Sequence, residues 1–536
     1  MSAQTAGRGF SAAPGASFAN GLIGLSAALL LVSCTGSATQ PGHPIGYNSS
    51  LAANMFSAGY EDVSSVYIED VTARQLALAG LHNLSTIDPG VEITDSAEQI
   101  SVRVGGQEAA AYRAPAHRDN EGWAKLTALA VDASRTGSSE LVKAESESIY
   151  EYVFDGMISA LDDYSRYAGR EEAQENRASR DGFGGIGVRI QIEDNGVRVN
   201  SVMENTPAER AGLLADDLIT HIDGAAAAGV AQREVIRKLR GRPNSPVRLT
   251  VSRSGAPAPL MIEVVRAHIV PQTIAYERRG NAAVLDVLGF NQTTTRNLKD
   301  KIELAFDVQG DSLSGIVLDL RDNPGGLLDQ AVSVSDLFLE EGLIVSTRGR
   351  HPDSHQSFDA HRGDSARGVP LVVLINGNSA SASEIVAAAL QDAGRAIVVG
   401  SSSFGKGTVQ TVLRLPNEGE LILTWARFHA PSGYALQDRG VMPDICTNAE
   451  NATISGSRFG ERAYIVSGSV VRRQVTPGDS AGVEALHGYC PPGQERADLD
   501  IEVAERLLDT PGLYTEILHG RIDTAERLLQ VSGTKL

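Results

Sequence analysis

The chain has 536 residues, of which 42% are hydrophobic and 21% charged, a composition typical of a globular protein and not of a disordered or fibrous one. At roughly 100 to 200 residues per domain, this length predicts three or four domains. The formal net charge of −19 repels the phosphate backbone, so it excludes nucleic acid as a main partner, and it also opposes binding to an anionic membrane surface.

The first 33 residues contain no acidic residue, and Arg8 is their only basic residue. The apolar run from Gly21 to Val32 is shorter than a membrane span of about 20 residues and is typical of the apolar segment of a signal peptide. It ends in LVSC, which resembles the bacterial lipoprotein signal, in which Cys34 would become the lipidated first residue. We therefore predict a lipoprotein signal over residues 1–33 and a periplasmic, membrane-anchored mature chain. The alternative is ordinary signal cleavage nearby.

The next segments are predicted as a tether and a helical region. Residues 34–50 are rich in Gly, Ser and Pro, which predicts a flexible linker between anchor and body. Residues 51–180 carry apolar side chains at helical spacing and are predicted to be mostly helical, with a strand-like stretch at 93–106. We expect these helices to serve packing.

Residues 181–268 have a β-rich pattern. A hairpin turn is predicted at Asn195 and Gly196, followed by a short helix that Thr206 caps and Pro207 begins, and then by strands around a second helix. This order resembles a PDZ domain. The resemblance implies a loop whose backbone N–H groups bind the terminal carboxylate of a peptide, formed here by Gly184, Gly185, Ile186 and Gly187. The alternative is that these glycines only turn the chain.

Residues 269–447 alternate between strand and helix patterns, which predicts an α/β domain with a mixed sheet. The apolar runs GIVLDL and LVVLI are typical of strands that are buried on both faces. Residues 448–536 are predicted as a C-terminal extension with two packing helices, around 499–508 and 515–529. Once the signal is removed, Cys446 and Cys490 form an even pair, for which a disulfide and two buried free thiols both stay open.

The stretch GSSSFGKGTVQ at 400–410 comes close to a phosphate-binding loop, but Gly407 stands where a hydroxyl should bind magnesium. The following TVQTVLRL has a strand pattern, whereas a phosphate loop must begin a helix. We therefore predict no nucleotide there. The nearby histidines lack triad or metal-binding spacing, and the sequence predicts neither a metal nor another cofactor; these histidines are His351, His355, His361 and His429.

A cluster of three serines begins a predicted helix: Ser379, Ser381 and Ser383. A serine at a helix N-terminus has free N–H groups beside it, which could stabilise an oxyanion. No G-x-S-x-G elbow surrounds any of the three. Lys406 could act as the base instead of histidine, provided that burial lowers its pKa. The residue pattern alone does not choose among the three serines.

Four ordered motifs carry a resemblance to a family: DLRDNPGG, SASASE, FGKGTVQ and GVMPD, which follow the PDZ-like module. They resemble the C-terminal processing, or tail-specific, proteases, which are serine peptidases with a Ser-Lys pair. The resemblance covers roughly residues 145–446. It implies that Ser381, which lies 25 residues before Lys406, is the nucleophile, that Lys406 is the general base and that Gln410 orients it.

The family resemblance also implies an oxyanion hole made of the N–H groups of Ala382 and Gly326, with Gly325 as the weaker candidate. Asp163 departs from the family, which often has proline there, and we expect this change to leave the active site untouched. The implied function is a periplasmic, lipid-anchored endopeptidase that captures C-terminal or unstructured polypeptide segments and cleaves them through an acyl-serine. It could work as an oligomer or with an adaptor. The alternative is a non-catalytic PDZ-containing lipoprotein with a vestigial protease domain.

Overall fold

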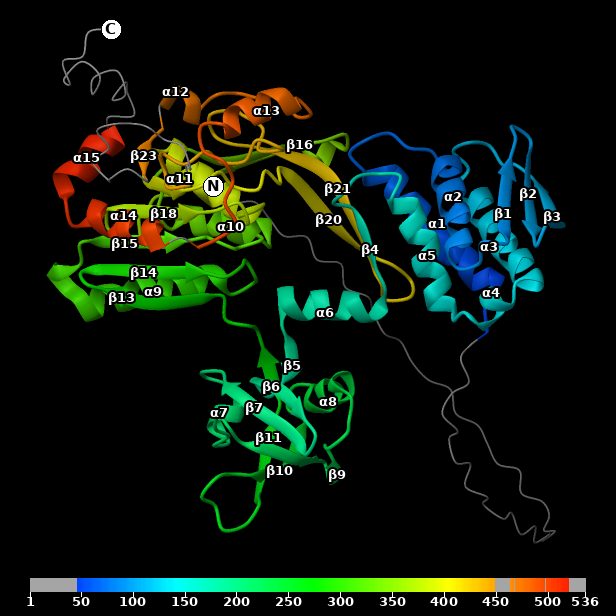
Figure 1. The fold of residues 1–536 in the computed structure, drawn as a ribbon, viewed down its shortest axis with the longest axis horizontal. Coiled ribbons are helices and arrows are strands. Elements are labelled where there is room, and N and C mark those ends of the chain that lie inside the picture. The colour runs from blue at the N-terminus through cyan, green and yellow to red at the C-terminus, as the bar shows by residue number, and fades with distance from the viewer. Residues whose placement is uncertain (1–45, 449–462, 467, 497, 520–536) are drawn as a thin grey trace, which may run out of the picture. The chain divides into compact units, whose positions relative to one another are not determined.

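The computed structural model describes residues 46–448, 463–466, 468–496 and 498–519 (Figure 1). The predicted signal peptide and Cys34 lie outside these ranges. Within them, no helix is long and apolar enough to cross a bilayer. The fold class predicted from the sequence is confirmed: the described chain contains a helical N-terminal region, a PDZ-like β-rich domain and an α/β core with a mixed sheet.

The N-terminal region consists of helices and one small antiparallel sheet of order β1-β2-β3. Its elements are α1 (Ser49–Val66), α2 (Ala73–His82), η1 (Asn83–Thr86), β1 (Val91–Asp95), β2 (Gln99–Val104), β3 (Gln107–Arg113), α3 (Asn120–Gly137), α4 (Ser139–Lys143) and α5 (Ser146–Ile158). Helix α1 starts inside the range 34–50 that was predicted as a tether. The Asn48 side chain accepts hydrogen bonds from the N–H groups of Ser50 and Leu51, both at 3.0 Å, and so caps the helix.

The PDZ domain has a sheet of order β11-β10-β8-β7-β6, with β6 at one edge and β9 paired to β8. Its elements are β6 (Val188–Glu193), β7 (Gly196–Val202), α7 (Pro207–Arg210), β8 (Leu218–Ile222), β9 (Ala225–Ala226), α8 (Gln232–Leu239), β10 (Pro246–Ser252) and β11 (Leu260–Val265). Helix α6 (Arg170–Asp181) and strand β5 (Phe183–Gly185) precede this domain in the chain, and strand β12 (Ala267–Ile269) follows it. Strands β5 and β12 pair with each other.

The first hairpin of the PDZ domain turns one residue earlier than predicted. Glu193 pairs with Gly196, so Asp194 and Asn195 form the turn and Gly196 begins β7. A Cβ at Gly196 would lie 2.6 Å from the carbonyl oxygen of Ile219, so the glycine is needed for close approach of the backbones and not for the turn.

The α/β core is built on a sheet of order β13-β14-β15-β18-β19-β22-β23, in which the strands from β14 to β22 run parallel and the two edge strands antiparallel. Its strands are β13 (Ile274–Arg279), β14 (Ala282–Val287), β15 (Gly315–Asp319), β18 (Leu371–Ile375), β19 (Ile397–Gly400), β22 (Ile445–Cys446) and β23 (Tyr464–Ile465). Every residue of β15 and β18 is buried, which confirms the prediction from their apolar runs.

Helices cover both faces of this sheet (Figure 1). One face packs against α9 (Thr294–Gln309), α10 (Leu328–Asp336) and α11 (Ala382–Asp392). The other packs against α14 (Asp498–Leu508) and α15 (Pro511–His519), so the C-terminal extension completes the core. Alternate strand residues divide between the two faces: Leu318 contacts the first group of helices and Val317 the second.

A second sheet, of order β17-β16-β21-β20, carries β4 on β21. Its strands are β4 (Arg166–Ala168), β16 (Leu343–Arg348), β17 (Gln356–Asp359), β20 (Thr408–Arg414) and β21 (Glu420–His429). Leu421 and Leu423 of β21 belong to the apolar core of the N-terminal region, so this hairpin joins that region to the α/β core.

The C-terminal extension also contains two short helices that the sequence did not predict, α12 (Gly468–Val471) and α13 (Ser480–His487). Helix α15 begins at Pro511, before the expected start at 515, and the predicted part beyond residue 519 lies outside the described residues. A disulfide joins Cys446 to Cys490, with a Cα–Cα distance of 5.8 Å, so the pair left open by the sequence is bonded.

Candidate active site

Ser381 lies directly before helix α11, at the end of the loop that leaves strand β18. Its φ angle is 56°, a conformation that is uncommon for a residue with a side chain and that is often found at functional sites. The backbone N–H of Ser381 donates a hydrogen bond of 2.7 Å to Oε2 of Glu384, which holds the residue in this conformation.

The structure separates the three serines that the residue pattern left equivalent. The Ser379 hydroxyl donates to the carbonyl oxygen of Leu320 at 2.8 Å, and the Ser383 hydroxyl donates to that of Asn323 at 2.9 Å. Both side chains are fully buried, whereas Ser381 is partly exposed. Of the three hydroxyls, that of Ser381 is therefore the one placed to meet a substrate.

The loop after strand β15 supplies the glycines predicted for the oxyanion hole. Gly325 is buried, its N–H donates to Oδ1 of Asn323 at 2.9 Å, and a Cβ on it would lie 2.9 Å from Cβ of Ser381. Gly326 is exposed, and neither its N–H nor that of Ala382 has a hydrogen-bond acceptor among the described residues. The arrangement favours Gly326 over Gly325 as an oxyanion donor, because the N–H of Gly325 is already used.

Lys406 lies in the loop between strands β19 and β20. The adjacent glycines allow this loop to pack on the backbone of residues 437–438: a Cβ would lie 1.9 Å from the nitrogen of Gln437 if placed on Gly407, and 2.9 Å from the carbonyl oxygen of Asp438 if placed on Gly405. These glycines thus serve close backbone packing.

The side chain of Lys406 is turned toward the N-terminal region. Its Nζ lies 5.3 Å from the ring centroid of Tyr164, and it forms no hydrogen bond with the Ser381 hydroxyl or with Gln410 within the described structure. Burial lowers the pKa of Lys406, and the charge of Arg166 lowers it further, against the opposing effect of Glu384 and Asp162. Gln410 instead donates through Nε2 to the hydroxyl of Thr408 at 2.8 Å.

Glu384 connects the serine and the lysine. Its Oε2 accepts from the backbone N–H groups of both Ser381 (2.7 Å) and Lys406 (2.9 Å), while Oε1 accepts from the Ser403 hydroxyl (2.5 Å) and the N–H of Gly405 (2.7 Å). The side chain is fully buried, and burial raises the pKa of Glu384 to about 6, against the lowering effect of these four donors.

The shared oxygen has a direct geometric consequence. Since the backbone nitrogens of Ser381 and Lys406 are both hydrogen-bonded to one atom, the two residues are neighbours in space. The lysine side chain is flexible, and these backbone bonds do not fix the direction of its Nζ. The sequence does contain a signal for Glu384, because Ser-x-x-Glu at a helix start is a capping-box pattern.

Comparisons with known proteins identify two domain families in the chain. The family model described as PDZ domain matches residues 184–264, and that described as Peptidase family S41 matches residues 281–447. The carboxy-terminal-processing protease of Bartonella bacilliformis is 44% identical over 303 residues, which cover 56% of this chain and 70% of that protein. The chain belongs to the carboxy-terminal-processing proteases of peptidase family S41.

One further relative and one solved structure also match the chain. The probable CtpA-like serine protease of Staphylococcus aureus is 35% identical over 308 residues, which cover 56% of this chain and 61% of that protein. The solved structure of the photosystem II D1 C-terminal processing protease is 22% identical and covers 73% of this chain and 92% of that chain, with a TM-score of 0.37. The predictions of family and of a serine-type peptidase are confirmed, and the non-catalytic alternative is set aside.

The predicted carboxylate-binding loop of this S41 protease divides between two environments. Gly184 and Gly185 lie in β5 and pair with β12, and a Cβ on Gly184 would lie 2.0 Å from the carbonyl oxygen of Gly241. Ile186 is buried in the PDZ core, and Gly187, with φ of 86°, leads into the edge strand β6. An edge strand beside this loop can accept a peptide as an added strand, and the assignment of the four loop residues stays a prediction.

The segment around Asp163 lies nearer the site than the sequence suggested. Asp163 is in the turn between α5 and β4, and the ring of the next residue, Tyr164, is the one that faces Lys406. Asp162 accepts from the N–H groups of Tyr164 and Ser165, both at 2.7 Å, which fixes the turn. The departure from the family pattern therefore lies next to a residue that contacts Lys406.

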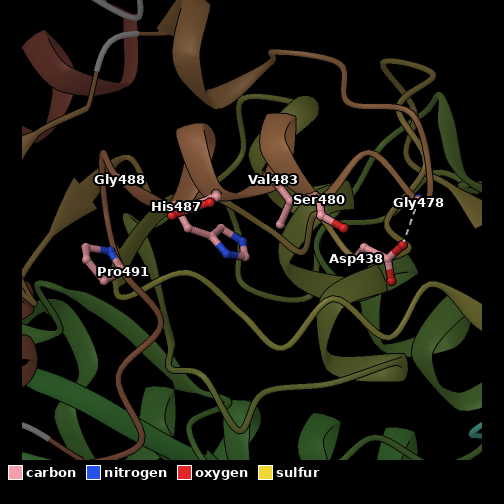
Figure 2. A pocket seen from close by; sticks show the side chains of 8 residues that line it. Asp438, Gly478, Ser480, Val483, His487, Gly488 and Pro491 are labelled. Atoms are coloured by element: carbon pink, nitrogen blue, oxygen red, sulfur yellow. Dashed lines mark hydrogen bonds between the residues drawn. The ribbon is translucent and has the colours of Figure 1, made fainter.

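A cavity of about 650 Å³ lies between helix α13 and the segment at Asp438 (Figure 2). Gly478 donates its N–H to Oδ2 of Asp438 at 3.0 Å, and the N–H of Asp438 donates to the carbonyl oxygen of Gly405 at 2.8 Å. One wall of the cavity is therefore bonded to the loop that carries Lys406.

Among the described residues, no group of three or more His, Cys, Asp or Glu side chains is arranged to bind a metal ion.

Proposed function

We propose that this C-terminal processing protease is a periplasmic, membrane-anchored endopeptidase in which Ser381 is the nucleophile and Lys406 the general base. The observation that carries the assignment is the shared carboxylate oxygen of Glu384, which fixes the backbones of both residues side by side. The lowered pKa of Lys406 supports it, because a neutral amine can take a proton.

The proposed reaction begins when Lys406 turns from Tyr164 toward Ser381, with Gln410 as the residue that orients the amine. Lys406 takes the proton of the Ser381 hydroxyl as the oxygen attacks the scissile carbonyl carbon. The N–H groups of Gly326 and Ala382 stabilise the resulting oxyanion. The C–N bond then breaks, Lys406 returns the proton to the leaving amine, and water hydrolyses the acyl-serine by the same steps.

We assign substrate capture to the PDZ domain, which would bind a polypeptide by its C-terminal carboxylate at Gly184, Gly185, Ile186 and Gly187. A substrate with a free carboxylate should therefore have a KM at least about tenfold lower than the same substrate with a C-terminal amide, because backbone N–H donors prefer the charged group. Steady-state cleavage of such a peptide pair measures this, and an equal KM for the two peptides would contradict the assignment.

The anchor is proposed from the sequence, with Cys34 as the lipidated residue. The full chain expressed in a bacterial host should sediment with membranes and resist a high-salt wash, whereas Cys34→Ala should be soluble in the periplasmic extract. A cysteine that carries more than one acyl chain anchors a protein stably in the membrane. The alanine variant carries no acyl chain. Recovery of Cys34→Ala in the washed membranes, or of either protein in the cytoplasmic extract, would contradict this location.

A further inference from the structure

A segment of the C-terminal extension, Cys490–Arg496, crosses the loops that form the active site. We call it the strap. It lies beyond the residues 281–447 that match the peptidase family model. Its first contacts are with the loop that leads to Lys406: the Ser402 hydroxyl donates to the carbonyl oxygen of Cys490 at 2.5 Å, and the N–H of Gly493 donates to the Ser401 hydroxyl at 2.9 Å.

The strap also contacts the loop that leads to Ser381. The N–H of Gly377 donates to the carbonyl oxygen of Gly493 at 2.6 Å, and Nδ2 of Asn378 donates to that of Gln494 at 3.1 Å. Gly493 thus bonds through its N–H to the lysine loop and through its carbonyl to the serine loop. One residue of the strap spans the gap between the two loops that must stay aligned for catalysis.

Arg496, at the end of the strap, contacts the third loop, which precedes the predicted oxyanion glycines. Its Nε donates to Oδ2 of Asp322 at 3.0 Å, and its guanidinium also donates to the carbonyl oxygen of Arg321 at 2.7 Å. Asp322 in turn accepts from Nδ2 of Asn376 and of Asn378, at 2.8 and 2.9 Å, so it joins the oxyanion loop to the serine loop.

Both ends of the strap are fixed to the core sheet. Cys490 is fully buried and forms the disulfide with Cys446 of β22, and Arg496 forms a two-pronged ion pair with Asp286 of β14, with both N–O distances at 3.1 Å. Pro491, next to the disulfide, lines the cavity of Figure 2. Because both ends of the strap are bonded to the core sheet, the strap itself can shift little. The loops that are hydrogen-bonded to it therefore keep their positions relative to one another.

We propose that the strap is a positioning element of the active site, which aligns the serine, lysine and oxyanion loops relative to one another. A displacement of about 1 Å between reacting groups can cost a factor on the order of 100 in rate. The strap touches no substrate and supplies no proton. It acts through the three loops, and the inference rests on the assignment of Ser381, Lys406 and Gly326 above.

The test uses the full chain and quenched-fluorescence casein, with kcat and KM measured separately. We expect Arg496→Gln to lower kcat at least about tenfold with KM changed less than about twofold, because the loops would be misaligned while substrate capture is intact. Arg496→Lys should have an intermediate kcat, since an ammonium group can keep one ion pair but not the bidentate contact. The matched control is Arg279→Gln. Its guanidinium pairs with Glu277 at 3.2 Å and with Glu505 of α14 at 3.8 Å, so it also joins the extension to the sheet, but within the described structure it forms no hydrogen bond or ion pair with the three loops.

A folded Arg496→Gln protein with a smaller loss of kcat, or with its loss in KM, would overturn the inference. If circular dichroism shows that this variant does not fold, Ser401→Ala is used as the test variant instead. This substitution removes the side-chain bond to Gly493 with little change in side-chain volume. A loss of kcat of about threefold or more in Ser401→Ala supports the strap, and a smaller loss overturns it. Ser381→Ala distinguishes the two proposals. If Ser381→Ala is inactive while the strap variants are fully active, only the strap inference fails. If Ser381→Ala is active, the proposed active site fails, and the strap inference that rests on it fails too.

Discussion

Replacement of Ser381 by alanine should reduce cleavage of an unfolded protein by a factor on the order of 10⁴ or more, because loss of the nucleophile in a serine peptidase leaves only binding and oxyanion stabilisation. The fold should persist, since alanine retains both backbone bonds of this residue to helix α11, the one from its own N–H to Glu384 and the one from the N–H of Ile385 to its carbonyl oxygen. Casein turnover and a thermal unfolding curve for the same preparation measure the two effects.

The neighbouring serines provide matched controls for this experiment. Ser379→Ala and Ser383→Ala each remove a buried hydroxyl that donates to a backbone carbonyl, at a cost of about 1 to 3 kcal/mol of unfolding free energy. Both should keep activity within about an order of magnitude of the unchanged chain, since neither hydroxyl is exposed to substrate. The assignment fails if Ser381→Ala retains turnover, or if either control loses as much activity as Ser381→Ala does.

Replacement of Lys406 by arginine should reduce kcat/KM by a factor on the order of 10³, which is the usual contribution of a general base. Arginine keeps the positive charge and much of the length of the side chain, but it stays protonated at every accessible pH and cannot take a proton from serine. Lys299→Arg, an exposed substitution on α9, is the matched control and should leave kcat/KM unchanged. Retention of more than about a tenth of the original activity by Lys406→Arg would reject the general-base role.

The pH dependence of the unchanged chain gives a second test of Lys406. Its pKa is lowered from the ordinary value of 10.5, and only the neutral amine is active, so kcat/KM should rise with pH and level off below the pH expected for an ordinary lysine. Protonation of Glu384, with a pKa of about 6, weakens its acceptance of the N–H groups of Ser381 and Lys406 and should add a further loss below that pH. A rate that falls as pH rises from about 6 to about 9 would contradict this assignment.

The sequence by itself determined the fold class, the order of the parts and the family of this protease. These properties depend on patterns that lie within short stretches of chain: apolar runs predict buried strands such as β15 and β18, and four ordered motifs carry the family resemblance. The same kind of information explains the small errors. Gly196 was predicted in a turn because the Asn-Gly pair is a local turn signal, whereas contact with Ile219, which is distant in the chain, requires the glycine in a strand.

Only the tertiary structure decided which groups surround the active site. The ring of Tyr164 beside Lys406, the four donors gathered on Glu384 and the strap that joins three loops all bring together residues from separate segments. Spacing along the chain cannot predict such contacts, because they depend on how the sheets and helices pack. The same packing distinguishes Ser381 from Ser379 and Ser383, since burial and carbonyl contacts occupy two hydroxyls and leave the third at the surface of the site.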